Sequence, residues 1–278
     1  MRGVSIVAES TTDEAAQFAA TVAALAARHE QPDPWTPGAA ASDANGALDE
    51  ALREAGWDEL ARDGDLLPLA APAGAALGRA FAPLAPVDAL LGGALKAGSL
   101  ARYATPGAVT AEPRSGAILD GVAKEATAVP YTDALGVASV RVSGERRLAA
   151  EEADRRMAAW VAASTGYIAG LSEEALRLAV EHARSRRAFG GPLSALEPVQ
   201  QMLADAATLV DGLTVLTADA PGMDALAHAG DAAERAVTIC MQVTGALGFT
   251  MEFPLQRAYR RSRSARSWND AVLAEWDL

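Results

Sequence analysis

A short stretch in the second half of the sequence combines residue types that could bind an anion. A helix-forming segment ends in a run of arginines, and Phe189 and a Gly-Gly-Pro turn follow directly; the arginines are Arg184, Arg186 and Arg187. Arginine presents a planar fork of donors that fits phosphate, and glycine lets the backbone come close to a ligand. The same residues match ordinary helix-stop chemistry, because cations favour the last turn and Gly then Pro ends a helix. Both interpretations stay open from this stretch alone.

A second stretch has a similar composition and follows another helix-forming segment. It reads Gln242-Val-Thr-Gly245-Ala-Leu-Gly248-Phe-Thr-Met-Glu252-Phe-Pro254-Leu and then Tyr259-Arg260-Arg261. Basic residues cluster here against an acidic background: Arg257, Arg260, Arg261, Arg263 and Arg266. This cluster is consistent either with a solvated helix face or with a site for a polyanion such as a phosphate-bearing cofactor.

In this order, the two stretches resemble two signatures of the C-terminal helical domain of the flavin-dependent acyl-CoA dehydrogenase family. The first signature is Arg-x-x-Phe-Gly-x-Pro-Leu followed by Val-Gln-x-x-Leu-Ala-Asp, and the second is Gln-x-x-Gly-Gly-x-Gly followed by Glu-x-Pro and Arg-(Asp/Arg). The resemblance covers about residues 180–262. Residues 52–60 are in addition similar to the N-terminal helical domain of the same family.

The resemblance implies a role in binding FAD across a subunit interface. In the family, these two segments contact the ADP half of the FAD held by the neighbouring subunit. The matching positions are Arg186 at the pyrophosphate, Phe189 near the adenosine, Leu193 in the pocket lining, and Gln242, Gly245 and Ala246 against the pyrophosphate and adenosine. Two positions depart from the pattern, since Ala246 replaces the second glycine and Glu197 stands where glutamine is usual. A carboxylate near a pyrophosphate is repulsive unless it points away or pairs with an arginine.

The catalytic base of the family is missing from its expected positions. Acyl-CoA dehydrogenation removes the pro-R α-proton of a thioester, and a carboxylate does this in most members. Asn269 occupies the usual glutamate position, and an amide cannot accept the proton. Asp270 is the adjacent candidate, but one residue turns about 100° around a helix, so it is expected to point elsewhere. The alternative position on an earlier helix corresponds to about Trp160, which is again not a carboxylate.

The segment that would support the flavin ring also departs from the family. Between about 101 and 147, glycine, proline, threonine and valine become frequent and short alternating runs indicate strands, such as those beginning at Ala117 and Gly136. The family's Thr-x-Pro-x-x-Gly-Ser loop is not reproduced by residues 105–107 or by residues 111–116. We therefore expect a truncated β-domain without the flavin support.

The chain is predicted to be mainly α-helical with a small β region, in the arrangement of an acyl-CoA dehydrogenase. The expected domains are an N-terminal helical domain (1–100), a truncated middle β-domain (101–148) and a C-terminal antiparallel four-helix bundle (149–278). Helices are predicted at 11–30, 46–63, 73–82, 87–98, 149–187, 195–218, 223–246 and 254–276, with a loop over 31–46 and breaks at Pro68 and Pro72. Gly166 and Gly170, one turn apart within a long helix, indicate close packing of a neighbouring helix.

Composition narrows the functional classes. The 278 residues are 50% hydrophobic with a net charge of −12, which is typical of a globular protein and argues against nucleic acid or an anionic membrane as partner. The single cysteine, Cys240, lies among apolar residues and is expected to be a buried, inert thiol, and the three histidines show no metal-ligand spacing. Without an apolar N-terminal segment or an 18-residue apolar run, a soluble, cytoplasmic protein is expected.

These observations lead to three functional hypotheses. The favoured one is a degenerate subunit of a heteromeric (α2β2) acyl-CoA dehydrogenase, of the kind that the family uses in actinobacterial steroid side-chain breakdown. Its cofactor is FAD shared with a second acyl-CoA dehydrogenase subunit, its substrate an acyl-CoA and its electron acceptor an electron-transfer flavoprotein, all as the resemblance implies. The alternatives are an autonomous homo-oligomeric enzyme with Asp270 as base, and a flavin-free helical scaffold or binding protein of the same fold.

Overall fold

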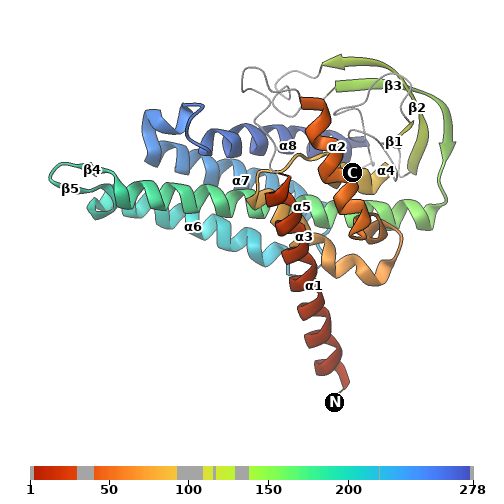
Figure 1. The fold of residues 1–278 in the computed structure, drawn as a ribbon, viewed down its shortest axis with the longest axis horizontal. Helices are drawn as coiled ribbons and strands as arrows, with labels where there is room; N and C mark the ends of the chain where they lie inside the picture. The colour runs from red at the N-terminus through yellow and green to blue at the C-terminus, as the bar shows by residue number, and fades with distance from the viewer. Residues whose placement is uncertain are drawn as a thin grey trace.

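The computed structural model describes residues 3–29, 41–92, 109–114, 117–128, 138–218 and 220–275. Its helices are α1 (Gly3–Arg28), α2 (Ala41–Glu54), α3 (Leu67–Arg79), α4 (Ala85–Gly92), α5 (Ala150–Ser185), α6 (Glu197–Leu216), α7 (Met223–Thr244) and α8 (Leu255–Glu275). Its strands are β1 (Val109–Arg114), β2 (Ala117–Ala128), β3 (Ala138–Arg147), β4 (Arg187–Ala188) and β5 (Gly191–Pro192). Figure 1 shows α5 to α8 running side by side along the long axis, with the β1–β3 sheet near one end and the β4–β5 hairpin at the other. The predicted mainly α-helical fold with a small β region is confirmed.

The centre of the molecule is the crossing of α3 and α5. A Cβ added to Gly166 would lie 2.7 Å from the carbonyl carbon of Ala71, and one added to Gly170 would lie 2.7 Å from that of Ala75. Gly74 and Gly78 of α3 are packed as closely against the backbone of α5. The predicted close approach of a helix to the glycine pair of α5 is therefore confirmed, and the glycines of α3 complete it.

The N-terminal helices differ from the prediction at their ends. The helix predicted at 46–63 is split, because Gly56 adopts a left-handed φ of 92° and a separate 3-10 helix, η1 (Trp57–Ala61), follows it. The breaks expected at Pro68 and Pro72 do not occur. Pro68 lies in the first turn of α3, where its missing N–H costs nothing, and Pro72 is accommodated inside that helix.

Other boundaries shift by several residues. The helix α1 begins at Gly3 rather than at 11, α2 begins at Ala41 rather than at 46, and α4 begins at Ala85 rather than at 87. Most of the predicted 31–46 loop and the end of the predicted 87–98 helix lie outside the described residues. The domain boundary expected after residue 100 lies there too, and the one after 148 stays a prediction, between the end of β3 and the start of α5.

The β region is an antiparallel meander in the order β1-β2-β3. β1 pairs with β2 from Val109↔Val122 to Arg114↔Ala117, and the β2–β3 register shifts twice, as at β-bulges. Residues 111–114, considered above as a flavin-supporting loop, are part of the edge strand β1. Proline is tolerated at such an edge, because an edge strand needs fewer backbone donors.

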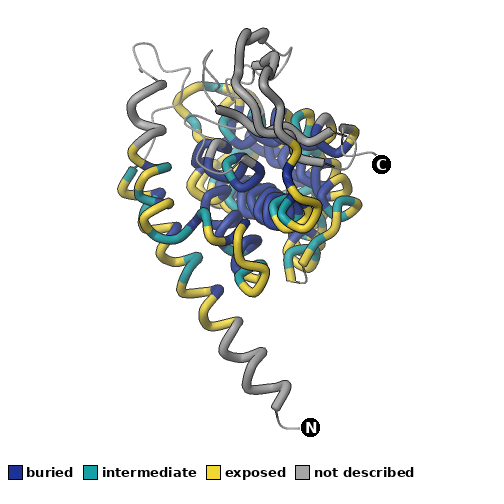
Figure 2. Tube along the Cα trace, turned by 90° about the vertical axis from the view of Figure 1, so that its right-hand side faces the viewer, coloured by how far each residue is buried: buried dark blue, intermediate teal, exposed yellow. Residues whose placement is uncertain are grey.

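The helices α5 to α8 form the predicted four-helix bundle. The middle of α5 is buried on all sides: every residue from Ala159 to Ser172 is buried. Figure 2 shows the buried residues gathered in the middle of the body, whereas the helix that leads from the N-terminus is largely exposed. The buried helix α5 therefore connects the two ends of the bundle.

Candidate cofactor-binding site

The first candidate segment forms a tight hairpin at the end of α5. Arg186 caps the helix by donating its backbone N–H to the His182 carbonyl oxygen at 2.8 Å. Strands β4 and β5 then pair through a two-residue turn, Phe189-Gly190, in which both residues have positive φ, 53° and 84°. Positive φ at both central positions matches the type I′ turn, in which a bulky non-glycine residue is uncommon. The sequence predicted a glycine turn but not this hairpin, and α6 begins at Glu197 rather than near 195 because a 3-10 turn, η4 (Leu193–Ala195), comes first.

The hairpin presents its candidate side chains outward. Phe189 is 91% exposed, the largest value among the exposed large hydrophobic residues of the described chain. Arg186 and Glu197 are exposed, and Leu193 is half-buried against the core. The described residues leave this phenylalanine almost fully exposed in a turn that disfavours it, so its ring is available to a ligand or another chain.

The second candidate segment follows α7. Gly245 caps this helix with φ 59° and ψ −143°, and a Cβ placed on it would meet nothing within 4 Å. Gln242 and Ala246 are exposed on either side of it, and apolar side chains continue the exposed surface: Leu247, Phe249 and Met251. Among the described residues, these three and Phe189 make up most of the large hydrophobic side chains left in solvent.

These two segments lie at the same end of the bundle. We call residues 186–193 the hairpin arm and residues 242–254 the turn arm. The ring of His182, one turn before Arg186 on α5, meets the ring of Phe253 in the turn arm edge-on, with 5.9 Å between centroids. The structure thus brings together the two sets of residues that the sequence predicted to share a nucleotide, although their individual roles stay predictions.

The electrostatics of this end are basic at α5 and its hairpin. Burial and the neighbouring Arg186 guanidinium both lower the pKa of His182 below its usual value, so the imidazole is neutral at pH 7. Arg184, Arg186 and Arg187 are all exposed. The anion-binding interpretation of this stretch is therefore physically feasible, while its residues also end the helix as the simpler interpretation expects.

The arginine cluster of α8 is largely neutralised within the chain. Arg263 pairs with Glu234 of α7 at 2.8 Å, and Arg266 pairs with both Asp231 and Glu234. Arg261 is buried and donates to the Ala82 carbonyl oxygen at 2.7 Å. These three arginines hold α8 against α7 and the segment between α3 and α4, so the polyanion interpretation does not fit them.

The usual base position holds a buried amide next to an unexpected polar group. Asn269 is 3% exposed, and its side-chain oxygen has no hydrogen-bond partner in the described part of the chain. Trp160 of α5 and Trp268 of α8 both donate their indole N–H to one oxygen of Asp88 in α4, at 3.1 and 3.2 Å. Asp88 is 1% exposed. Trp160, one of the positions considered for the base, thus converges with Trp268 on Asp88, and the other position holds the buried amide of Asn269.

Sequence reasoning missed Asp88. The only signal was a lone carboxylate in the apolar segment Pro-Val-Asp-Ala-Leu-Leu, and nothing local shows that tryptophans 72 and 180 residues away approach it. Asp270 lies on a different face of α8, where it is exposed and pairs with Arg266 at 3.7 Å. Burial raises the pKa of Asp270, and Arg266 opposes this shift. The structure therefore separates Asp270 from the Asn269 position.

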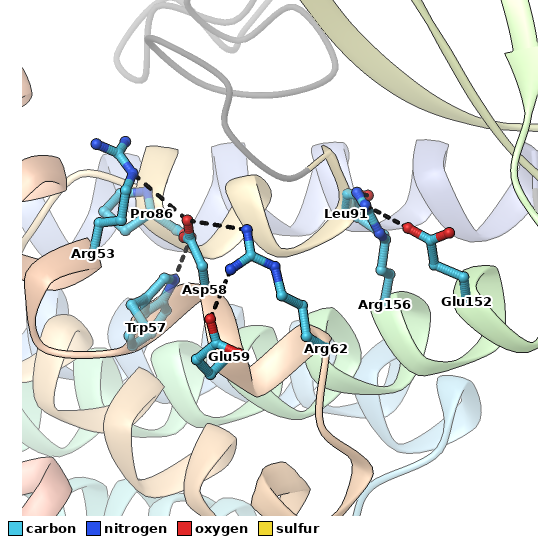
Figure 3. Close-up of polar contacts among 9 residues, drawn as sticks. All are labelled: Arg53, Trp57, Asp58, Glu59, Arg62, Pro86, Leu91, Glu152 and Arg156. Carbon is cyan, nitrogen blue, oxygen red and sulfur yellow. Dashed lines mark hydrogen bonds and ion pairs between the residues drawn. The ribbon is translucent and has the colours of Figure 1, made fainter.

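Polar contacts also fasten η1 and α4 to the bundle, as Figure 3 shows. The Trp57 indole donates to the Pro86 carbonyl oxygen at 2.7 Å, and Arg156 of α5 donates to the Leu91 carbonyl oxygen at 3.0 Å. Asp58 pairs with Arg53 at 3.5 Å and with Arg62 at 3.9 Å. These contacts position α4, and with it Asp88, against α5.

An open pocket of about 420 Å³ lies beside the turn arm, between α1, α3, α5 and α8. Its lining includes Arg79, which pairs with Glu173, and Arg177, which pairs with Glu174 and Glu181. These two arginines are already balanced by neighbouring carboxylates, and Arg257 also lines the pocket.

The described residues contain no group of three or more metal-ligating side chains. Cys240 is buried, and burial raises the pKa of its thiol to about 12, as expected of an unreactive cysteine. None of the helices in the described ranges is long and apolar enough to cross a membrane.

Comparison with known proteins identifies the bundle. A sequence model of the acyl-CoA dehydrogenase C-terminal domain matches residues 152–269. Residues 152–269 thus have the sequence of an acyl-CoA dehydrogenase C-terminal domain. The matched range extends from the first turn of α5 to Asn269 within α8, and it includes both arms.

Curated relatives match about a third of the chain. The mitochondrial short-chain specific acyl-CoA dehydrogenase of Sus scrofa is 36% identical over 34% of this chain and 26% of that protein. The cyclohex-1-ene-1-carbonyl-CoA dehydrogenase of Syntrophus aciditrophicus is 32% identical over 34% of this chain and 26% of that protein. The matched stretch thus spans about a quarter of the length of these relatives.

Several solved structures match almost the whole chain. A steroid ACAD variant, Tcur3481-Tcur3483, has a TM-score of 0.67 at 16% identity and covers 96% of this chain and 98% of that one. The ChsE4-ChsE5 complex from Mycobacterium tuberculosis has a TM-score of 0.66 at 18% identity and covers 94% of this chain and 95% of that one. At these identities the likeness shows the fold alone.

Proposed function

We propose that this chain is a subunit of a heteromeric FAD-dependent acyl-CoA dehydrogenase that completes the ADP half of the FAD site of a partner subunit. The observation that carries the proposal is the exposure of the two arms at one end of the bundle while the base position is filled. The partner supplies the catalytic base and the support for the flavin ring. FAD, when bound, accepts the hydride that leaves the β-carbon of the thioester.

The exposed residues of the arms suit the ADP half of this cofactor. Arg186 offers a guanidinium fork to the pyrophosphate, and Gly245 leaves open space beside its backbone. Phe189 offers a fully exposed ring for the adenosine. The rest of this surface is formed by Leu193, Gln242 and Ala246. Glu197 is exposed, so its carboxylate has room to point away from the phosphates.

The interior of this chain argues against a second, independent reaction site. Trp160, Trp268 and Asn269 fill the region where the family places its base, and Asp88 is sealed beneath the indoles. A carboxylate that is 1% exposed cannot reach the α-carbon of a thioester without rearrangement. Asp270 is accessible but pairs with Arg266 on another face, so we assign the base to the partner.

The partner and substrate classes follow from the fold relatives. Two of the structures that match almost the whole chain are named as pairs of proteins, and one of these is named as a steroid ACAD. We therefore extend the proposal to an α2β2 assembly that dehydrogenates a bulky acyl-CoA such as a steroid side-chain thioester. An electron-transfer flavoprotein reoxidises the flavin, as elsewhere in the family.

The first experiment is co-expression with a neighbouring acyl-CoA dehydrogenase gene, followed by an absorption spectrum and a light-scattering mass. The proposal predicts a colourless lone chain and a yellow complex with about one FAD per pair of unlike chains. A lone chain that binds one FAD per chain and oxidises an acyl-CoA would refute it. In that case Asp270 becomes the base to test.

A matched pair of arginine variants tests the cofactor contact. Arg186→Ala should weaken FAD binding by the complex about 10-fold or more, since a charge-assisted hydrogen bond to an anion contributes about 1.5–3 kcal/mol. Arg184→Ala removes an equally exposed arginine two residues earlier on α5 and should leave FAD binding within about twofold. Equal effects of the two variants would mean that only the general basic charge of the hairpin matters.

A further inference from the structure

His182 joins the two arms of the proposed site. It lies on α5 one turn before Arg186, and its carbonyl oxygen accepts the backbone N–H of Arg186 at 2.8 Å and the hydroxyl of Ser185 at 3.1 Å. Its ring meets Phe253 of the turn arm with an interplanar angle of 68°. One residue therefore contacts the base of the hairpin arm through its backbone and the turn arm through its side chain.

We propose that His182 is a positioning residue for the cofactor, which sets the spacing between the hairpin arm and the turn arm. This inference rests on the proposed function and deepens it. Neither the base nor the substrate is involved. The ligand concerned is the ADP portion of FAD, which would have to contact both arms at once.

The geometry gives a reason for such a role. Arg186 directly follows α5, and Gln242 lies near the end of α7, 56 positions later in the sequence (242 minus 186). Both side chains are exposed. A ligand that contacts both arms loses affinity if either arm drifts, because the binding free energy depends on preorganised contacts. The edge-on ring contact between His182 and Phe253 fixes the distance between the arms at their bases, near the point where the nucleotide would enter.

The chemistry of the contact indicates which substitutions should preserve it. An edge-to-face ring pair needs an aromatic ring rather than a charge. His182 is half-buried and lies beside the Arg186 guanidinium, which disfavours an imidazolium at this place. Phenylalanine should therefore replace His182 without loss, whereas alanine should not.

The test uses the purified complex with its partner subunit and measures the dissociation constant for FAD by flavin fluorescence. His182→Ala should raise it about 2- to 10-fold, the range expected when an aromatic pair is lost. His182→Phe should restore it to within about twofold of the wild type. Glu181→Ala is the matched control, because Glu181 precedes His182 on α5 and its exposed ion pair with Arg177 contributes little.

Two results would overturn the inference. One is FAD binding by His182→Ala that equals the wild type, and the other is a His182→Phe variant that binds FAD as weakly as His182→Ala. Arg186→Ala separates this inference from the proposed function. If Arg186→Ala binds FAD normally, the arms do not hold the cofactor and both ideas fail. If Arg186→Ala is weakened and His182→Ala is not, only the role of His182 is refuted.

Discussion

Removing the buried carboxylate of Asp88 should strongly destabilise the fold, although Asp88 takes no part in the proposed chemistry. It accepts indole N–H groups from Trp160 and Trp268 at 3.1 and 3.2 Å and is 1% exposed. A hydrogen bond to a charged group contributes about 1.5–3 kcal/mol, and a neutral one about 0.5–1.5 kcal/mol. Asp88→Ala leaves two indole donors without this acceptor, so we expect a loss of about 3–5 kcal/mol.

The conservative substitution changes Asp88 least. Asp88→Asn keeps a side-chain oxygen as acceptor in nearly the same shape, so we expect a smaller loss, about 1–3 kcal/mol. At roughly 2 °C per kcal/mol for a chain of this size, the midpoint of thermal unfolding should fall by about 6–10 °C for Asp88→Ala and about 2–6 °C for Asp88→Asn.

The assay is thermal unfolding followed by circular dichroism at fixed protein concentration, since assembly itself shifts the midpoint. Asp205→Ala, an exposed carboxylate on α6, is the control and should stay within about 0.5 kcal/mol of the wild type. In a double-mutant cycle, Trp160→Phe and Asp88→Ala should be less than additive. An Asp88→Ala variant as stable as the control, or strict additivity with Trp160→Phe, would contradict this account of the buried carboxylate.

Four further predictions concern other parts of the chain. Gly170→Ala should destabilise by several kcal/mol because its Cβ would meet the α3 backbone, whereas Gly212→Ala, with nothing within 4 Å, should stabilise slightly; urea unfolding of both variants distinguishes these signs. Cys240, with a thiol pKa raised to about 12, should resist Ellman's reagent at pH 8 until the protein unfolds; rapid reaction in the native state would contradict its burial. Asp270→Asn should leave the turnover of the complex unchanged, and a large drop would reinstate it as the base. Because the pKa of His182 is lowered in the folded state, the unfolded chain takes up the proton first, and stability should fall as the pH drops below about 6.5; His182→Phe should reduce this dependence in urea titrations at pH 7 and pH 5.5.

Features encoded by local spacing were predictable from the sequence. The four-residue spacing of Gly166 and Gly170 correctly indicated a close helix contact, because few other arrangements favour two glycines inside a long helix. The apolar periodicity gave all four bundle helices within a few residues of their observed ends. By contrast, Pro68 was read as a break although it lies in the first turn of α3, where proline is favoured.

Features that depend on distant residues were not predictable. The hairpin turn at Phe189-Gly190 carries a phenylalanine at positive φ, a choice that local turn preferences disfavour and that only its surroundings can enforce. The convergence of Trp160 and Trp268 on Asp88 depends on how three helices pack. The candidate residues of the cofactor site were placed by family signatures, and their contacts with FAD stay predictions until the complex is measured.

The glycine crossing between α3 and α5 also constrains how the chain folds during synthesis. Contacts around this crossing span long stretches of sequence; the hydrogen bond from Tyr167 to Ala82, for example, joins residues 85 apart. At about 5–20 residues per second, roughly 4–17 s separate the emergence of α3 from that of its partner helix. During this interval the Ala- and Gly-rich face of α3 has no helix to cover it. This face of α3 is therefore covered only after α5 leaves the ribosome.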